Sequence, residues 1–110
     1  MGSEFTRITE REALDQLVER SKQRPIVIFK HSTTCPTSAI AYRSMQDFDG
    51  EIVLVEVQRA RELSREIEEK TGVQHESPQV IVLRNGQVVW DASHFQIKAA
   101  AVAEAVRQNS

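Results

Sequence analysis

Residues 25–45 read PIVIFKHSTTCPTSAIAYRSM and contain the only cysteine of the 110-residue chain. The stretch opens with a continuous apolar, β-branched run of the kind that is buried on both faces of a sheet. The cysteine, Cys35, follows a short polar segment and precedes Pro36, a residue suited to the first position of a helix. This order predicts a strand over 25–30, a polar loop that carries the thiol, and a helix over 36–48.

Apolar periodicity on either side of this stretch extends the prediction to the whole chain. Thr9 and Glu12 have the spacing of a capping box, and Ser93 and Gln96 have the same spacing near the end of the chain. An Asn-Gly pair within residues 84–87 predicts a tight hairpin turn between two short strands. The expected elements are a helix over 10–22, strands at 25–30 and 52–57 with a helix after the first, a helix between Ala60 and Gly72, strands at 80–83 and 88–90, and a final helix capped near Ser93.

Strands that alternate with helices predict a parallel pair with a right-handed crossover, to which the C-terminal hairpin adds two strands. The expected fold class is therefore α/β, in the order α-βαβα-ββα, with a four-stranded mixed sheet between helices. Residues 1–5 read MGSEF, which resembles a cloning remnant, so we expect residues 6–110 to form a single domain. In such sheets ligands bind beyond the carboxyl ends of parallel strands, which is where the sequence places Cys35.

Composition argues against several function classes. The formal net charge is −2 and the 14 basic residues are scattered, so we expect no nucleic-acid partner. The sequence has no apolar run of membrane-spanning length and nothing like a signal peptide, so we expect a cytoplasmic protein with no membrane partner. One cysteine cannot close an intramolecular disulfide, and the sequence shows no metal-ligand spacing.

The expected position of Cys35 favours its thiolate, because unpaired N–H groups and the positive end of the helix dipole lower the pKa of a thiol there. Ser38, three residues later, places a hydroxyl one helical turn away that can donate a hydrogen bond to the sulfur. Because the chain has no resolving sulfur, a mixed disulfide on Cys35 must be released by a thiol from outside the chain. We therefore expect a substrate in which one sulfur is capped by a small thiol.

Residues outside the cysteine motif supply weaker candidates. Ser77 and Pro78 precede the third expected strand, where a cis proline would hold exposed backbone beside the thiol. Lys30 has two interpretations, because it can attract an anionic thiol or extend from the end of the strand as a snorkelling side chain. His31 either adds positive charge near the thiolate or is an ordinary loop residue, which is the favoured interpretation. His75 either lines the groove or lies on the surface.

The segments FKHSTTCPTS (29–38) and HESPQV (75–80) resemble the monothiol bacilliredoxins of the thioredoxin superfamily. The resemblance implies a thioredoxin-like fold and an enzyme that removes bacillithiol from S-bacillithiolated client proteins in bacteria. It also implies bacillithiol as the co-substrate, with no tightly bound cofactor. The candidate catalytic residues are Cys35 and Ser38, and the candidate substrate-binding residues are Thr34, Pro36, Ser77 and Pro78.

Two other hypotheses stay open. A monothiol glutaredoxin-like module would hold an iron–sulfur cluster between two chains, with a small thiol as the other ligand. The motif Cys-Pro-Thr-Ser differs from the Cys-Gly-Phe-Ser of those glutaredoxins, which makes this the alternative hypothesis. A redox-inactive interaction domain is the third, and its thiol would react as an ordinary cysteine. Thioredoxin itself fits less well, because it has a buried acid six residues before the first motif cysteine, where this chain has Phe29.

Overall fold

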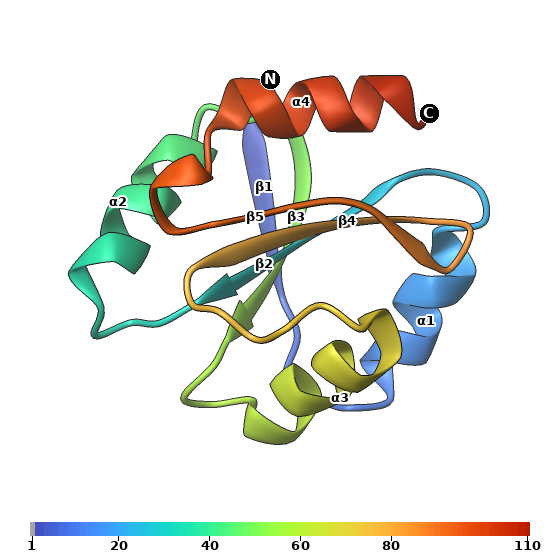
Figure 1. Cartoon of the computed structure of the whole chain (residues 1–110), viewed down its shortest axis with the longest axis horizontal. Coiled ribbons are helices and arrows are strands. Elements are labelled where there is room, and N and C mark those ends of the chain that lie inside the picture. The colour runs from blue at the N-terminus through green and yellow to red at the C-terminus, as the bar shows by residue number, and fades with distance from the viewer. Residues whose placement is uncertain (1) are drawn as a thin grey trace.

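Strand β2 (Ile26–His31) lies at the centre of the sheet, between β3 (Gly50–Glu56) and β4 (Gln79–Arg84). The computed structural model describes residues 2–110 and gives the strand order β1-β3-β2-β4-β5 (Figure 1). Strand β3 runs parallel to β2, whereas β4 runs antiparallel to it. Residues 26–29 of β2 are buried, as their unbroken apolar run predicted, and Lys30 is buried after them. The predicted α/β class with a mixed sheet is confirmed.

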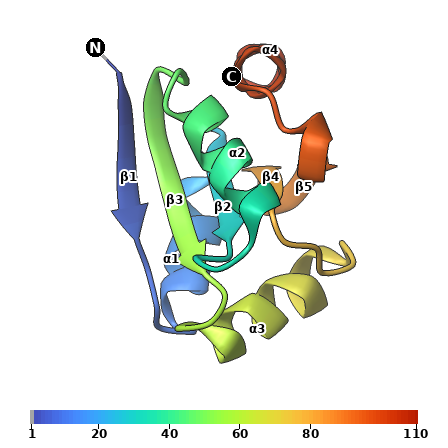
Figure 2. The same ribbon diagram turned by 90° about the vertical axis from the view of Figure 1, so that its left-hand side faces the viewer.

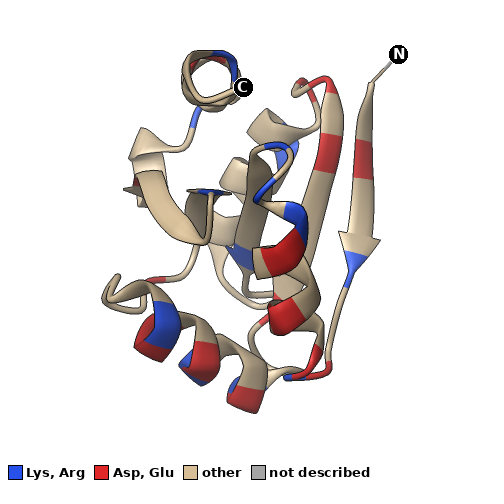
Figure 3. Cartoon of the chain, turned by 90° about the vertical axis from the view of Figure 1, so that its right-hand side faces the viewer, with Lys and Arg blue, Asp and Glu red and all other residues tan. Residues whose placement is uncertain are grey.

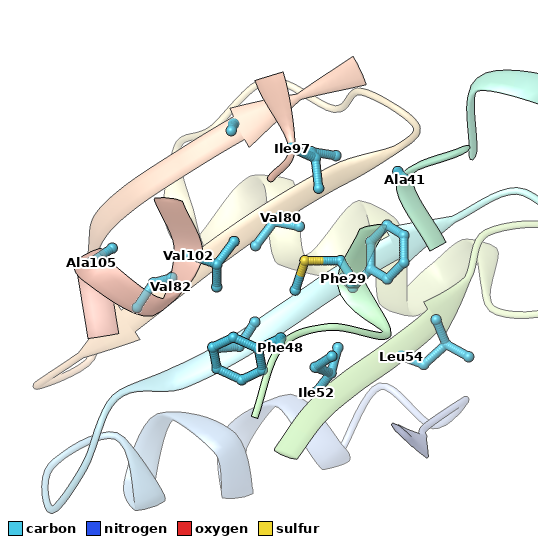
Figure 4. Close-up of a cluster of buried hydrophobic side chains, with 13 residues drawn as sticks. Phe29, Ala41, Phe48, Ile52, Leu54, Val80, Val82, Ile97, Val102 and Ala105 are labelled. Atoms are coloured by element: carbon cyan, nitrogen blue, oxygen red, sulfur yellow. The ribbon is translucent and has the colours of Figure 1, made fainter. Parts of the chain in front are cut away.

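Helices cover both faces of the sheet (Figure 2). One face packs against α1 (Ala13–Arg20) and α3 (Arg61–Thr71), and the other packs against α2 (Pro36–Met45) and α4 (Ala99–Gln108). Side chains along β2 alternate between these two apolar layers, with Phe29 on the α2 side. Figure 4 shows the apolar layer on the α2 side, which also contains Met45 and Phe48. Among the described residues no helix is long and apolar enough to cross a membrane.

An additional strand, β1 (Ser3–Arg7), forms one edge of the sheet and pairs in parallel with β3. The expected count of four strands is therefore wrong, because residues 3–5 take part in the sheet rather than preceding it. The ring of Phe5 stacks on Tyr42 of α2, with centroids 4.6 Å apart, so aromatic packing helps to hold the strand. The origin of residues 1–5 as a cloning remnant stays a prediction, and Met1 lies outside the described residues.

The C-terminal hairpin forms as predicted. Strands β4 and β5 (Gln87–Ser93) are antiparallel, and Asn85 and Gly86 between them have φ values of 57° and 76°. Positive φ at both central residues is what a type I′ turn requires, and Asn-Gly tolerates it best. The sequence signal was strong here because it depends on the local backbone alone.

Both predicted capping boxes are wrong. Helix α1 begins at Ala13, its N-cap is Glu12, and no side chain in the described part of the chain caps it. At the other end of the chain Ser93 belongs to β5, where it pairs with Gln79, and a short 3-10 helix η1 (His94–Gln96) follows. Helix α4 starts only after Lys98. Pairing within the sheet outweighs the local capping preference of Ser93.

Candidate active site

Cys35 lies at the N-terminus of α2. This end of α2 is beside the ends of the parallel strands β2 and β3 (Figure 2). It is the N-cap residue, with extended backbone at φ −96° and ψ 123°, and Pro36 occupies the first helical turn. The carbonyl of Cys35 accepts the N–H of Ala39 at 3.1 Å, which closes that turn. The cysteine is partly exposed, so its thiol is accessible to a substrate from outside.

The pKa of the Cys35 thiol is lowered, chiefly by the backbone N–H of Ser38. The N–H of Thr37 and the hydroxyls of both residues act in the same direction, whereas desolvation opposes them. Among residues 2–110 no side chain caps the N-terminus of α2, so the N–H groups of its first turn are free to face the sulfur. The structure thus combines accessibility with a stabilised thiolate, the two properties that a nucleophilic cysteine needs.

Ser38 connects the thiol to the loop that precedes it. Its side chain is completely buried, and its Oγ accepts a hydrogen bond from the backbone N–H of Ser32 at 3.1 Å. A hydroxyl that accepts one bond still has its own proton, which it can donate to the sulfur of Cys35. Ser38 therefore fixes the loop and stabilises the thiolate with one group.

Gln58, in the segment between β3 and α3, holds the same loop from the other side. Its Nε2 donates to Ser32 Oγ at 2.7 Å and to Thr34 Oγ1 at 3.0 Å, and its Oε1 accepts the N–H of Thr33 at 3.3 Å. Gln58 was not among the residues predicted from the sequence. Its position in the sequence could have identified it, because Gln58 comes just after β3, which is parallel to β2. The carboxyl ends of parallel strands lie at the same edge of a sheet, so residues that follow them lie close together.

The second sequence motif also reaches the cysteine. The Ser77–Pro78 peptide bond is cis, and Ser77 lines the same cleft as Cys35. The buried Oγ of Ser77 has no hydrogen-bond partner among residues 2–110. The carbonyl of Pro78 accepts the N–H of His94 at 3.0 Å, which ties this loop to η1. Of the predicted site residues, Cys35 and Ser77 line the cleft, whereas Thr34, Pro36, Ser38 and Pro78 do not.

A cleft of about 500 Å³ opens beside Cys35, a volume in the range of small-molecule sites. Helix α3 forms one wall, and basic and acidic residues are interspersed along it (Figure 3). The charged residues of the cleft are Arg61, Arg65 and Glu68 of α3, and His75 lies beyond them. None of the three α3 residues was predicted from the sequence, because charged residues on one face of an amphipathic helix are usually exposed to solvent.

Lys30 lies behind this wall and is completely buried, so the snorkelling interpretation is wrong. Its Nζ donates to the carbonyl of Ser64, a cleft residue, at 3.4 Å. Burial lowers the pKa of Lys30 to about 8, and the charge of Glu68 partly opposes that shift. Gln79, its partner across the sheet, is also buried, and its Oε1 has no hydrogen-bond partner among the described residues.

The two histidines near the motif lie on opposite sides of the sheet. His75 lines the cleft, and burial followed by the charge of Lys30 lowers its pKa. His31 belongs to β2 rather than to a loop, and its ring packs beside Phe29 and Tyr42 with centroids 5.6 and 5.2 Å away. Burial lowers the pKa of His31, so its ring is neutral at neutral pH and adds no charge near the thiolate.

Comparison with known proteins identifies both a family and a fold. The family profile of the monothiol bacilliredoxin BrxC matches residues 6–102. A solved structure described as a proposed oxidoreductase with a thioredoxin fold is 34% identical, covers 92% of both chains and has a TM-score of 0.84. The Schistosoma mansoni thioredoxin pre-protein is 20% identical, with a TM-score of 0.70 over 97% of this chain and 99% of its own. Fasciola hepatica thioredoxin is 16% identical, with a TM-score of 0.65 over 96% and 99%. The two thioredoxins show the fold alone, and the predicted thioredoxin-like fold is confirmed.

Proposed function

Because the chain belongs to the monothiol bacilliredoxin family, we propose that it removes bacillithiol from S-bacillithiolated protein cysteines. Family and fold together make it a thiol-active oxidoreductase. The observation that carries the finer proposal is the single accessible thiol at the N-terminus of α2, with Ser38 where a dithiol enzyme has its second sulfur. The proposed partners are client proteins and bacillithiol, in the cytoplasm, where small thiols stay reduced.

In the first step the Cys35 thiolate attacks the bacillithiol sulfur of the mixed disulfide. The bond between that sulfur and the client breaks as the bond to Cys35 Sγ forms, and the client leaves as a thiolate that takes a proton from water. One disulfide replaces another, so no outside oxidant or reductant is needed. The client is released in its reduced form.

In the second step a free bacillithiol thiolate attacks the bacillithiol sulfur held on Cys35. Bacillithiol disulfide forms and the Cys35 thiolate leaves, which restores the enzyme. A thiol of lowered pKa is a better leaving group, so the groups that stabilise the Cys35 thiolate assist this step too. Ser38 cannot form a disulfide, which keeps the small thiol on Cys35 until an external thiol arrives.

The test follows transfer by intact-mass spectrometry. One test protein is prepared in bacillithiolated and in glutathionylated form, each is mixed with this protein, and the masses of both partners are read over time. Bacillithiol should move to the enzyme much faster than glutathione, and Cys35→Ser should accept neither. Equal and slow transfer of both thiols would contradict the proposal. A visible absorption band and a dimer after anaerobic purification would instead support the iron–sulfur alternative.

A further inference from the structure

Two arginines of α3 face the cleft beside Cys35 without an acidic partner. Arg61 and Arg65 are four residues apart in the helix, so they lie on one face, and both line the cleft. Within residues 2–110 neither side chain makes an ion pair, whereas Arg7, Arg20 and Arg107 all contact carboxylates. Their guanidinium groups are therefore free to bind a ligand.

The remaining charges of the cleft leave it basic. Its acidic residue, Glu68, accepts the backbone N–H of His75 at 2.7 Å and is thereby tied to the loop that follows α3. The buried Lys30 donates a hydrogen bond to the carbonyl of Ser64 in α3 and adds a further basic group close to the cleft. Among the described residues no side chain caps the N-terminus of α3 at Ala60, so the first N–H groups of the helix have no side-chain acceptor at the end that carries Arg61.

We propose that Arg61 and Arg65 bind carboxylate groups of the small thiol whose sulfur is joined to Cys35. A guanidinium and a carboxylate form paired, directional hydrogen bonds, which neither a neutral nor a cationic thiol can match. The cleft is large enough for a small thiol and too small for a folded client, which leaves the client outside it. This inference rests on the proposed function and assigns Arg61 and Arg65 as specificity-determining residues for its co-substrate.

The test compares an acidic with an uncharged disulfide. The reduced protein is mixed with the symmetrical disulfide of mercaptosuccinate or of 2-mercaptoethanol, and the mass added to Cys35 is followed over time. Each reaction forms one mixed disulfide and releases one free thiol, so the ratio of the two rates reports carboxylate recognition. A change in the reactivity of the Cys35 thiolate alters both rates together and cancels in the ratio.

The informative variant is Arg61→Gln combined with Arg65→Gln. Its matched control is Arg11→Gln combined with Arg43→Gln, which removes the same charge from exposed arginines outside the cleft. The ratio of acidic to uncharged rates should fall roughly tenfold in the first variant, and by less than about twofold in the control. Added salt should reduce the preference of the unmodified protein, because exposed charge pairs are screened.

Three outcomes would overturn the inference, and they separate it from the proposed function. An unchanged ratio in the Arg61 and Arg65 variant, with rapid uptake of both disulfides, would overturn the carboxylate site and leave the enzyme's thiol chemistry intact. An equal fall in the control would assign the effect to net charge. Uptake of both disulfides no faster than by free cysteine would overturn the proposed function together with the inference.

Discussion

The buried hydroxyl of Ser38 accepts the backbone N–H of Ser32 at 3.1 Å and thereby joins the first turn of α2 to the loop that follows β2. Cys35 lies between these two residues in the sequence, so this hydrogen bond holds together the two ends of the segment that carries the thiol. The same hydroxyl keeps its proton available for the sulfur. A serine at this position is thus a positioning residue for the nucleophile as well as a substitute for a second cysteine.

The first prediction concerns Ser38→Ala. The pKa of the Cys35 thiol should rise, because one of the groups that stabilise the thiolate is removed, and alkylation at neutral pH should slow several-fold. The protein should also lose about 0.5–1.5 kcal/mol of stability, since the partly buried N–H of Ser32 loses its acceptor. The pH profile of iodoacetamide alkylation and urea unfolding measure the two effects.

Ser44→Ala is the matched control, because Ser44 lies in the same helix and its hydroxyl makes no hydrogen bond within residues 2–110. Its alkylation profile should match that of the unmodified protein. A Ser38→Ala profile that also matches would mean that the hydroxyl does not act on the sulfur.

The second prediction concerns Gln58→Ala. Three hydrogen bonds to the loop disappear, so the amide of Thr33 should exchange with solvent faster, and thiol transfer should slow several-fold because the loop is less ordered. Stability should fall by no more than about 1 kcal/mol, because water replaces bonds at exposed groups. Hydrogen exchange followed by NMR measures the loop directly.

Gln46→Ala is the control for that experiment, since Gln46 is an exposed glutamine at the C-terminal end of α2. Its amide exchange near Thr33 and its transfer rate should be unchanged. Normal protection of Thr33 in Gln58→Ala would contradict the role of Gln58 as a tether.

The third prediction concerns β1. Phe5→Ala should lower the free energy of unfolding by about 1–3 kcal/mol, because it removes the ring stacked on Tyr42 and loosens the edge strand. Phe95→Ala removes the same atoms from a side chain that is 68% exposed, so its effect should stay below about 0.5 kcal/mol. Urea unfolding compares the two, and equal effects would mean that the stacking of Phe5 on Tyr42 contributes nothing to stability.

The strand, loop and helix around Cys35 were predictable because each signal is local. An unbroken β-branched run, a polar loop and Pro36 agree with one another, and their order alone places the thiol at the edge of the sheet. The Asn-Gly hairpin was predictable for the same reason. By contrast, β1 depends on pairing with β3, a partner far along the chain, and its short sequence has no strand pattern of its own.

Only some of the residues that line the cleft could be predicted from the sequence. The cysteine motif and Ser77 were found because their residue types are distinctive, whereas Arg61 and Arg65 are charges on the outer part of an amphipathic helix. They become candidates only once α3 is seen packed beside the end of β2, which the helical period does not specify. Lys30 could not be predicted to be buried, because a charged residue at the end of a strand is usually exposed. In this protein α3 packs over it.

The last prediction follows from the burial of Lys30. Its pKa falls from the ordinary 10.5 to about 8 in the folded protein, so between these values the unfolded chain binds a proton that the native state lacks. Stability contributed by this residue should therefore rise by about 3 kcal/mol as the pH increases from about 8 to 10.5. Urea unfolding at several pH values should show this rise in the unmodified protein and in Lys22→Met, whose side chain is exposed, but not in Lys30→Met. Parallel curves for the unmodified protein and Lys30→Met would mean that Lys30 titrates as a solvated amine, and that it adds no buried charge behind the cleft.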